Sequence, residues 1–99
     1  MEKQVFLILA FPEEKTKAAL LALALPLVQE LHAACGEAPQ SMKSDESVVM
    51  LFAKGEFARI EAAVQEALPS HIRYLVLHIG RPYVATGLSA IHSWLRAHC

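Results

Sequence analysis

The sequence predicts a single α+β domain over residues 1–99, and two observations support this prediction. The first is a set of three short runs, 5–11, 48–53 and 72–79, that are apolar on both faces, as in strands inside a covered sheet. The second is that longer segments with helical spacing separate these runs. A chain of 99 residues buries roughly two thirds of its unfolded surface, which allows one core and leaves no room for a second domain.

The first third of the chain predicts a strand followed by a long helix. Pro12 ends the strand at 5–11, and the two glutamates after it favour a helix N-terminus. The helix predicted over 13–35 contains the stretch AALLALALPLV, which has almost no polar face. It is therefore either buried on more than one side, or it carries small alanines on its surface. Pro26 predicts a kink or a break, and Gly36 is a natural helix stop.

Residues 36–47 admit two interpretations. They form either a plain loop or a hairpin, with a short edge strand over 38–42 and a turn at 43–45. Pro39 is tolerated only at the edge of a sheet, and Asp, Ser and Lys suit the turn. A structureless connection of this length is long for a compact domain, so the hairpin is the favoured prediction.

The middle of the chain predicts strand, helix and strand. The strand at 48–53 is followed by a turn at Lys54 and Gly55, and a helix is predicted over 56–68. Four apolar residues share one face of that helix: Phe57, Ile60, Val64 and Leu68. Pro69 stops the helix, and the strand at 72–79 follows.

A loop bounded by glycines, residues 80–87, leads to a last helix over 88–98. Thr86 or Ser89 is the expected N-cap. Leu88, Ile91 and Leu95 share one face of this helix, and Trp94 lies beside them. Arg96 and His98 suit the negative end of the helix dipole.

Two folds accommodate these elements. With the hairpin, the order is β-α-β-β-α-β followed by a helix, which is the ferredoxin-like order. Without it, the order is βαβαβα, a three-layer fold with a small parallel sheet. In both folds two helices cover one sheet face, so the last helix or a second copy of the protein must cover the other.

Several segments resemble small ferredoxin-like proteins related to the CRISPR-associated adaptation nuclease. They are VVMLFAKG, the helix ending in EALPS, YLVLHIGR and GLSAIHSWLRAH, within residues 45–98. The resemblance implies the ferredoxin-like fold and a dimer. Nucleases of that family carry an acidic metal-binding residue at the end of the first strand. Here that strand ends at Phe11 and Pro12, and Glu13 belongs to the helix start, so the resemblance does not extend to that acid.

The composition favours self-association over binding to nucleic acid or membranes. Apolar residues make up 55% of the chain and charged residues 19%, which is more apolar surface than one small core needs. The net charge of −1 gives no general attraction to nucleic acid or to an anionic membrane. The longest apolar run, 18–28, is well short of the roughly 20 residues of a membrane span.

The cysteines and the N-terminus favour a cytoplasmic protein. Cys35 and Cys99 do not form a disulfide framework, and the first residues lack the basic region of a secretory signal. His32 and Cys35 lie three apart on the predicted first helix, a spacing that suits metal ligands, and His92, His98 and Cys99 could complete a site. Zinc sites usually contain a second closely spaced pair, however, so the sequence predicts no metal and no cofactor.

The best candidate for a binding site is a group that we call the His78 cluster: His78, Arg81 and Tyr83. His78 interrupts an apolar strand near its end, and the other two residues follow in the loop. Groups at strand ends often bind ligands, and this set could hold an anionic ligand or the carboxylate of a partner. The alternative is structural, with His78 satisfied on a sheet face and Arg81 at the surface.

The leading functional hypothesis is a small non-enzymatic interaction or regulatory module, cytoplasmic and homodimeric, that also has surface for a protein partner. One alternative is a metal-dependent nuclease or small hydrolase on the same fold. A nuclease would need clustered acids and a basic groove, which the sequence lacks. Another alternative is a small domain that binds an anionic ligand at the His78 cluster.

Overall fold

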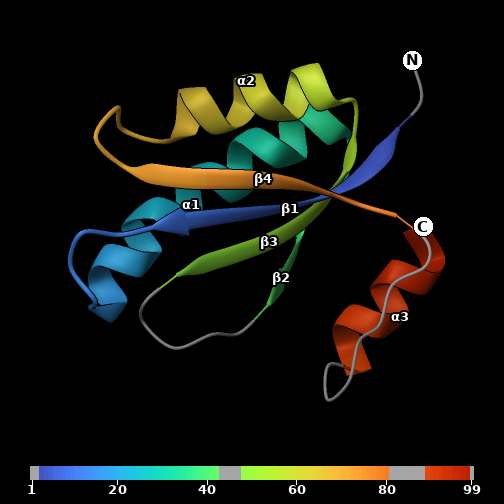
Figure 1. Ribbon diagram of the computed structural model, residues 1–99, viewed down its shortest axis with the longest axis horizontal. Coiled ribbons are helices and arrows are strands. Elements are labelled where there is room, and N and C mark those ends of the chain that lie inside the picture. Colours follow the sequence, from blue (N-terminus) through green and yellow to red (C-terminus); the bar gives the residue numbers. More distant parts are fainter. Residues whose placement is uncertain (1–2, 43–47, 81–88, 99) are drawn as a thin grey trace.

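The computed structural model describes residues 3–42, 48–80 and 89–98. The elements are, in order, β1 (Gln4–Phe11), α1 (Lys17–Cys35), β2 (Gln40–Met42), β3 (Val49–Gly55), α2 (Phe57–Ala67), β4 (Arg73–Ile79) and α3 (Ser89–His98). The protein is α+β, with an open four-stranded sheet and three helices among the described residues (Figure 1). The element order β-α-β-β-α-β-α is the one predicted with the hairpin.

The sheet is antiparallel throughout. Its strand order is β2-β3-β1-β4, and all three neighbouring pairs run antiparallel. The alternative with a parallel sheet is therefore wrong. The predicted edge strand is confirmed as β2, although it begins at Gln40, and the turn predicted at 43–45 lies outside the described residues. β4 is the other edge of the sheet. The sequence predicted that both faces of this strand are covered, but within the single chain most of its residues are exposed.

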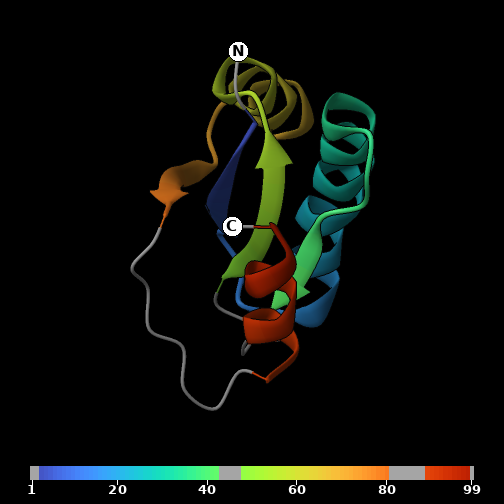
Figure 2. The same ribbon diagram turned by 90° about the vertical axis from the view of Figure 1, so that its right-hand side faces the viewer.

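One face of the sheet carries the main core. Phe6, Ile8 and Ala10 of β1 point to this face, because alternate residues of a strand share a face. They pack against the buried sides of α1 and α2, which both lie on this side of the sheet (Figure 2). Several side chains in this core have almost no exposed surface: Ile8, Leu27, Leu31, Leu51, Ile60 and Val64.

The opposite face of the sheet is covered only in part. Val5, Phe52 and Leu95 form a second buried cluster, which joins α3 to β1 and β3. Trp94 packs against it, with its ring centroid 6.2 Å from that of Phe52. Figure 1 shows α3 apart from the other two helices, against one end of the sheet. The prediction that Leu95 belongs to the core is confirmed, while the side chains of Leu88 and Ile91 lie outside the described part.

The first helix differs from its prediction at its start and at Pro26. It begins at Lys17 and not at residue 13, because the Thr16 hydroxyl accepts a hydrogen bond from the Ala19 amide at 3.1 Å and caps the helix. The helix continues through Pro26 without a break. Gly36 ends it in the left-handed conformation, with φ of 79°, as its position predicted.

Within the single chain only one stripe of α1 is buried, so the chain itself does not cover this helix on more than one side. Its buried residues lie four apart: Leu23, Leu27, Leu31 and Cys35. Leu21 and Leu25 face outward and are 47% and 60% exposed. By length and composition alone α1 could cross a membrane. In this structure its buried stripe packs into the main core.

Two further predictions in the middle of the chain are wrong. Lys54 and Gly55 do not form a turn, because β3 continues through them and pairs them with Val5 and Gln4. Phe57 does not join the buried face of α2, since it is 48% exposed. Its ring lies beside the ring of Phe6, with 5.5 Å between centroids. The other three residues predicted for that face are buried: Ile60, Val64 and Leu68.

Candidate functional site

His78 lies near the end of β4 and is exposed. Its backbone pairs with Phe6, and the two rings are 5.6 Å apart between centroids. The chain passes close to the imidazole at Gly80, where an added Cβ would lie 3.2 Å from Cε1 of His78. Glycine thus lets the ring sit against the backbone. The other members of the His78 cluster, Arg81 and Tyr83, lie outside the described residues.

The structure brings other basic side chains to His78. A pocket of about 330 Å³ opens where β1 begins and where β3 and β4 end. We call it the basic pocket. Its lining residues are Lys3, Gln4, Val5, Lys54, His78, Ile79, Gly80 and His98. Four segments far apart in the sequence thus each contribute one basic residue to the lining of this pocket. Lys54 pairs with Val5 and His78 pairs with Phe6, so these two side chains lie on opposite faces of the sheet where the strands end.

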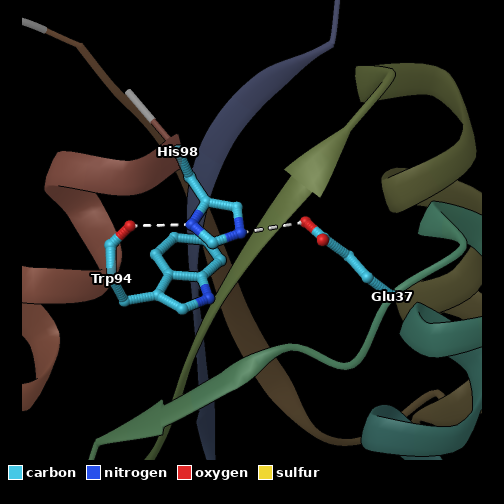
Figure 3. A network of polar contacts seen from close by, with 3 residues as sticks. All are labelled: Glu37, Trp94 and His98. Carbon is cyan, nitrogen blue, oxygen red and sulfur yellow. Dashed lines mark hydrogen bonds and ion pairs between the residues drawn. The ribbon is translucent and has the colours of Figure 1, made fainter.

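His98 joins α3 to the segment that follows α1 (Figure 3). Its Nδ1 lies 2.7 Å from the carbonyl oxygen of Trp94, one helical turn earlier, and donates to it because a carbonyl only accepts. Its Nε2 lies 3.3 Å from a carboxylate oxygen of Glu37. The imidazole also stacks on the Trp94 ring, with 4.0 Å between centroids. These contacts fix the ring at the edge of the basic pocket.

Among the described residues, the candidate metal ligands do not converge, while Cys99 and the side chain of His92 lie outside the described part. His32 is exposed, whereas Cys35 is buried in the core. Within residues 3–42, 48–80 and 89–98 no group of three or more His, Cys, Asp or Glu residues could hold a metal ion. Glu13, the acid nearest the end of β1, is exposed and lies 3.4 Å from Nε2 of His71. Two exposed partners in such a pair add little to stability.

Cys35 is a structural thiol in this fold. Burial raises its pKa above the ordinary value, the Glu37 carboxylate raises it further, and Lys3 lowers it by a smaller amount. Its Sγ fills the space beside Gly55, where an added Cβ would lie 2.9 Å away. A buried thiol with a raised pKa is mostly protonated at neutral pH, and the protonated form is a poor nucleophile.

We therefore expect Cys35 to resist alkylation in the folded protein. In a Cys99→Ser variant it is the single thiol, and it should react with iodoacetamide at neutral pH many times more slowly than free cysteine. The same variant unfolded in urea is the control, and it should react at the rate of free cysteine. Equal rates with and without urea would contradict the buried position of Cys35.

A second candidate site is apolar and lies on the less covered side of the sheet. We call it the open sheet face: Leu7, Leu9, Phe11, Met50, Leu75 and Leu77. These residues share a face because Leu9 pairs with Met50 and Leu75, and Leu7 pairs with Leu77. Phe11, Leu75 and Leu77 are 39%, 46% and 41% exposed. Chemically, this surface can bind only by removing apolar groups from water.

The sequence did not point to two of the pocket residues. Lys54 was assigned to a turn, but β3 extends to Gly55 and places Lys54 opposite Val5. Lys3 precedes β1, and the sequence did not predict which strands pair with β1. The one available signal was the β-pairing register, since extending the strand at 48–53 by two residues brings Lys54 to the start of β1.

Comparisons with known proteins add no assignment to this geometry. No family model, curated protein or solved structure matches the chain.

Proposed function

We propose that the protein is a non-enzymatic interaction module that self-associates as a homodimer, on a ferredoxin-like fold. The fold proposal is supported by the element order β-α-β-β-α-β before α3 and by the antiparallel strand order β2-β3-β1-β4. The resemblance to small proteins related to the CRISPR-associated adaptation nuclease implies the same fold and a dimer. A cytoplasmic location fits this proposal and stays a prediction.

The open sheet face carries the proposal. Leu75 and Leu77 are exposed on the edge strand β4, and Leu7 and Leu9 of the neighbouring β1 are half-buried. α3 covers only the end of the sheet near Val5 and Phe52. At about 3.3 Å per residue and about 4.8 Å between strands, the open part of three strands spans on the order of several hundred Å². Soluble monomers rarely expose an apolar patch of that size unless it binds something.

A second copy of the chain is the partner that fits this face best. The six residues of the open sheet face carry no charge. The charged residues on the same side of the sheet, Arg73 opposite Phe11 and Lys54 opposite Val5, lie at its two ends, so two copies can meet over the leucines without burying a charge. The net charge of −1 gives only weak repulsion between copies. Stable interfaces bury roughly 800 Å² per partner, to which this face and its rim can contribute a large part. Two-fold symmetry would bury the same patch on both copies.

The test is the mass of the protein in solution, measured by light scattering on a size-exclusion column at micromolar concentration. We expect twice the chain mass of 10.9 kDa for the unchanged protein. The double variant Leu75→Lys, Leu77→Lys should be monomeric, because each buried lysine would lose its hydration. The matched control is Leu25→Lys, which places the same charge on the exposed outer side of α1 and should leave the dimer intact.

Other outcomes would assign the surfaces differently. A monomer of the unchanged protein would contradict self-association and leave the open sheet face to a different protein partner. If Leu25→Lys disrupts the dimer and the double variant Leu75→Lys, Leu77→Lys does not, the interface lies on α1. Circular dichroism of each variant shows that a change in mass does not come from unfolding.

A further inference from the structure

We propose that the basic pocket binds the phosphate group of a small molecule. The proposal goes beyond self-association and does not depend on it. Lys3 precedes β1, Lys54 is near the end of β3, His78 is near the end of β4, and His98 is near the end of α3. No aspartate or glutamate is among the described residues that line the pocket.

Neither lysine of the pocket, Lys3 or Lys54, forms an ion pair within the described part of the chain. Lys3 also lines a neighbouring pocket that contains Glu56. At the edge of the basic pocket, Glu37 pairs with His98. Glu37 therefore holds the imidazole in place and leaves both ammonium groups available. Like charges that share a small space repel each other, and a bound anion would remove this repulsion.

The types of side chain favour phosphate over a carboxylate. Each lysine offers three donors on a compact charge, and the His78 imidazole offers one or two more. Both ring nitrogens of His98 are already engaged, by the Trp94 carbonyl and by Glu37. A phosphate monoester carries between one and two negative charges near neutral pH and has three acceptor oxygens, so it can use donors from several directions at once. A carboxylate has a single charge and two oxygens.

The size of the pocket limits the ligand. A volume of about 330 Å³ is at the small end of the range for ligand sites. Gly80 has no side chain to occupy the pocket, and a Cβ there would lie 3.2 Å from the His78 ring. A polyanion such as nucleic acid needs a long basic surface, whereas these basic groups meet in one place. A small phosphorylated molecule, or phosphate itself, matches both the charge and the volume.

Titration followed by NMR tests the proposal at constant ionic strength. The ring C–H signals of His78 and His98 should shift and saturate with inorganic phosphate, with a dissociation constant near or below about 1 mM. Acetate at the same ionic strength should bind several-fold more weakly. A parallel titration with glycerol phosphate distinguishes an organic phosphate from inorganic phosphate as the ligand. Tighter binding of the ester assigns the pocket to an organic phosphate, and equal binding assigns it to the free anion.

Substitutions connect the binding to the pocket. Lys54→Gln should weaken phosphate binding about tenfold, since one charge-assisted contact is worth at least 1.4 kcal/mol. Lys3→Gln should act in the same direction and serves as a second variant if Lys54→Gln does not fold. Lys17→Gln removes the same charge from the exposed start of α1 and is the matched control. It should leave the affinity unchanged within about twofold.

Several results would overturn the proposal. One is that the NMR shifts do not saturate up to about 20 mM phosphate, and another is that acetate binds as tightly as phosphate. A third is that Lys17→Gln and Lys54→Gln weaken phosphate binding equally. The single sheet variant Leu75→Lys separates the two proposals. It should bind phosphate normally, because Leu75 pairs with Leu9 and lies four residues before Ile79, which lines the pocket.

Discussion

Replacing Leu27 by alanine should lower the free energy of unfolding by about 2–5 kcal/mol, the usual cost of a leucine lost from a packed core. Leu27 is 0% exposed and packs between α1 and the sheet. Leu25→Ala is the matched control, because it makes the same change two residues earlier in the same helix. Leu25 is 60% exposed, so this change should alter stability by less than about 0.5 kcal/mol.

Urea unfolding followed by circular dichroism measures both variants at equal protein concentration, because dimerisation would add a concentration-dependent term. A loss of about 2 kcal/mol should lower the melting temperature by roughly 10 °C in a domain of this size. If Leu27→Ala and Leu25→Ala lower the free energy of unfolding equally, α1 does not pack through a single face. That result would favour a setting in which the whole helix is surrounded by apolar groups, such as a membrane.

The sequence predicted the strands and helices well because their patterns are local. Unbroken apolar runs such as 48–53 are short, and helical spacing such as that of Ile60 and Val64 spans about one turn, so neither depends on distant residues. The start of α1 was missed because the sequence offers two plausible helix starts. Pro12 and the acids after it favour one, and Thr16, which is the cap in the structure, favours the other. The choice between two plausible starts is made by how α1 packs on the sheet.

The candidate site was predictable only in part, because it depends on strand pairing. His78 stands out in its own strand, and the structure places it in the basic pocket. Lys3 and Lys54 reach the same place through the register of β1 with β3, which no local pattern encodes. The exposure of β4 was missed for a similar reason. A strand with Leu75 and Leu77 on one face and Val76 on the other looks the same in sequence whether a helix or a second copy covers its leucines.

Removing α3 should have the largest effect on stability outside the main core. Leu95 is 4% exposed and closes the cluster with Val5 and Phe52, while Trp94 lies beside it. Ending the chain at Gly87 would expose that cluster and should leave the protein insoluble or molten, with no cooperative thermal transition. Leu95→Ala is the milder form of the same test, and it should cost about 2–5 kcal/mol.

Arg96→Ala is the matched control, because Arg96 is the next residue of α3 and is exposed. It should change the free energy of unfolding by less than about 0.5 kcal/mol. Near-ultraviolet circular dichroism reports on Trp94 directly, since its fixed position gives a signal that a loose helix would lose. If Leu95→Ala and Arg96→Ala melt at the same temperature, α3 does not belong to the core. Val5 and Phe52 would then join the open sheet face as further interface for a partner.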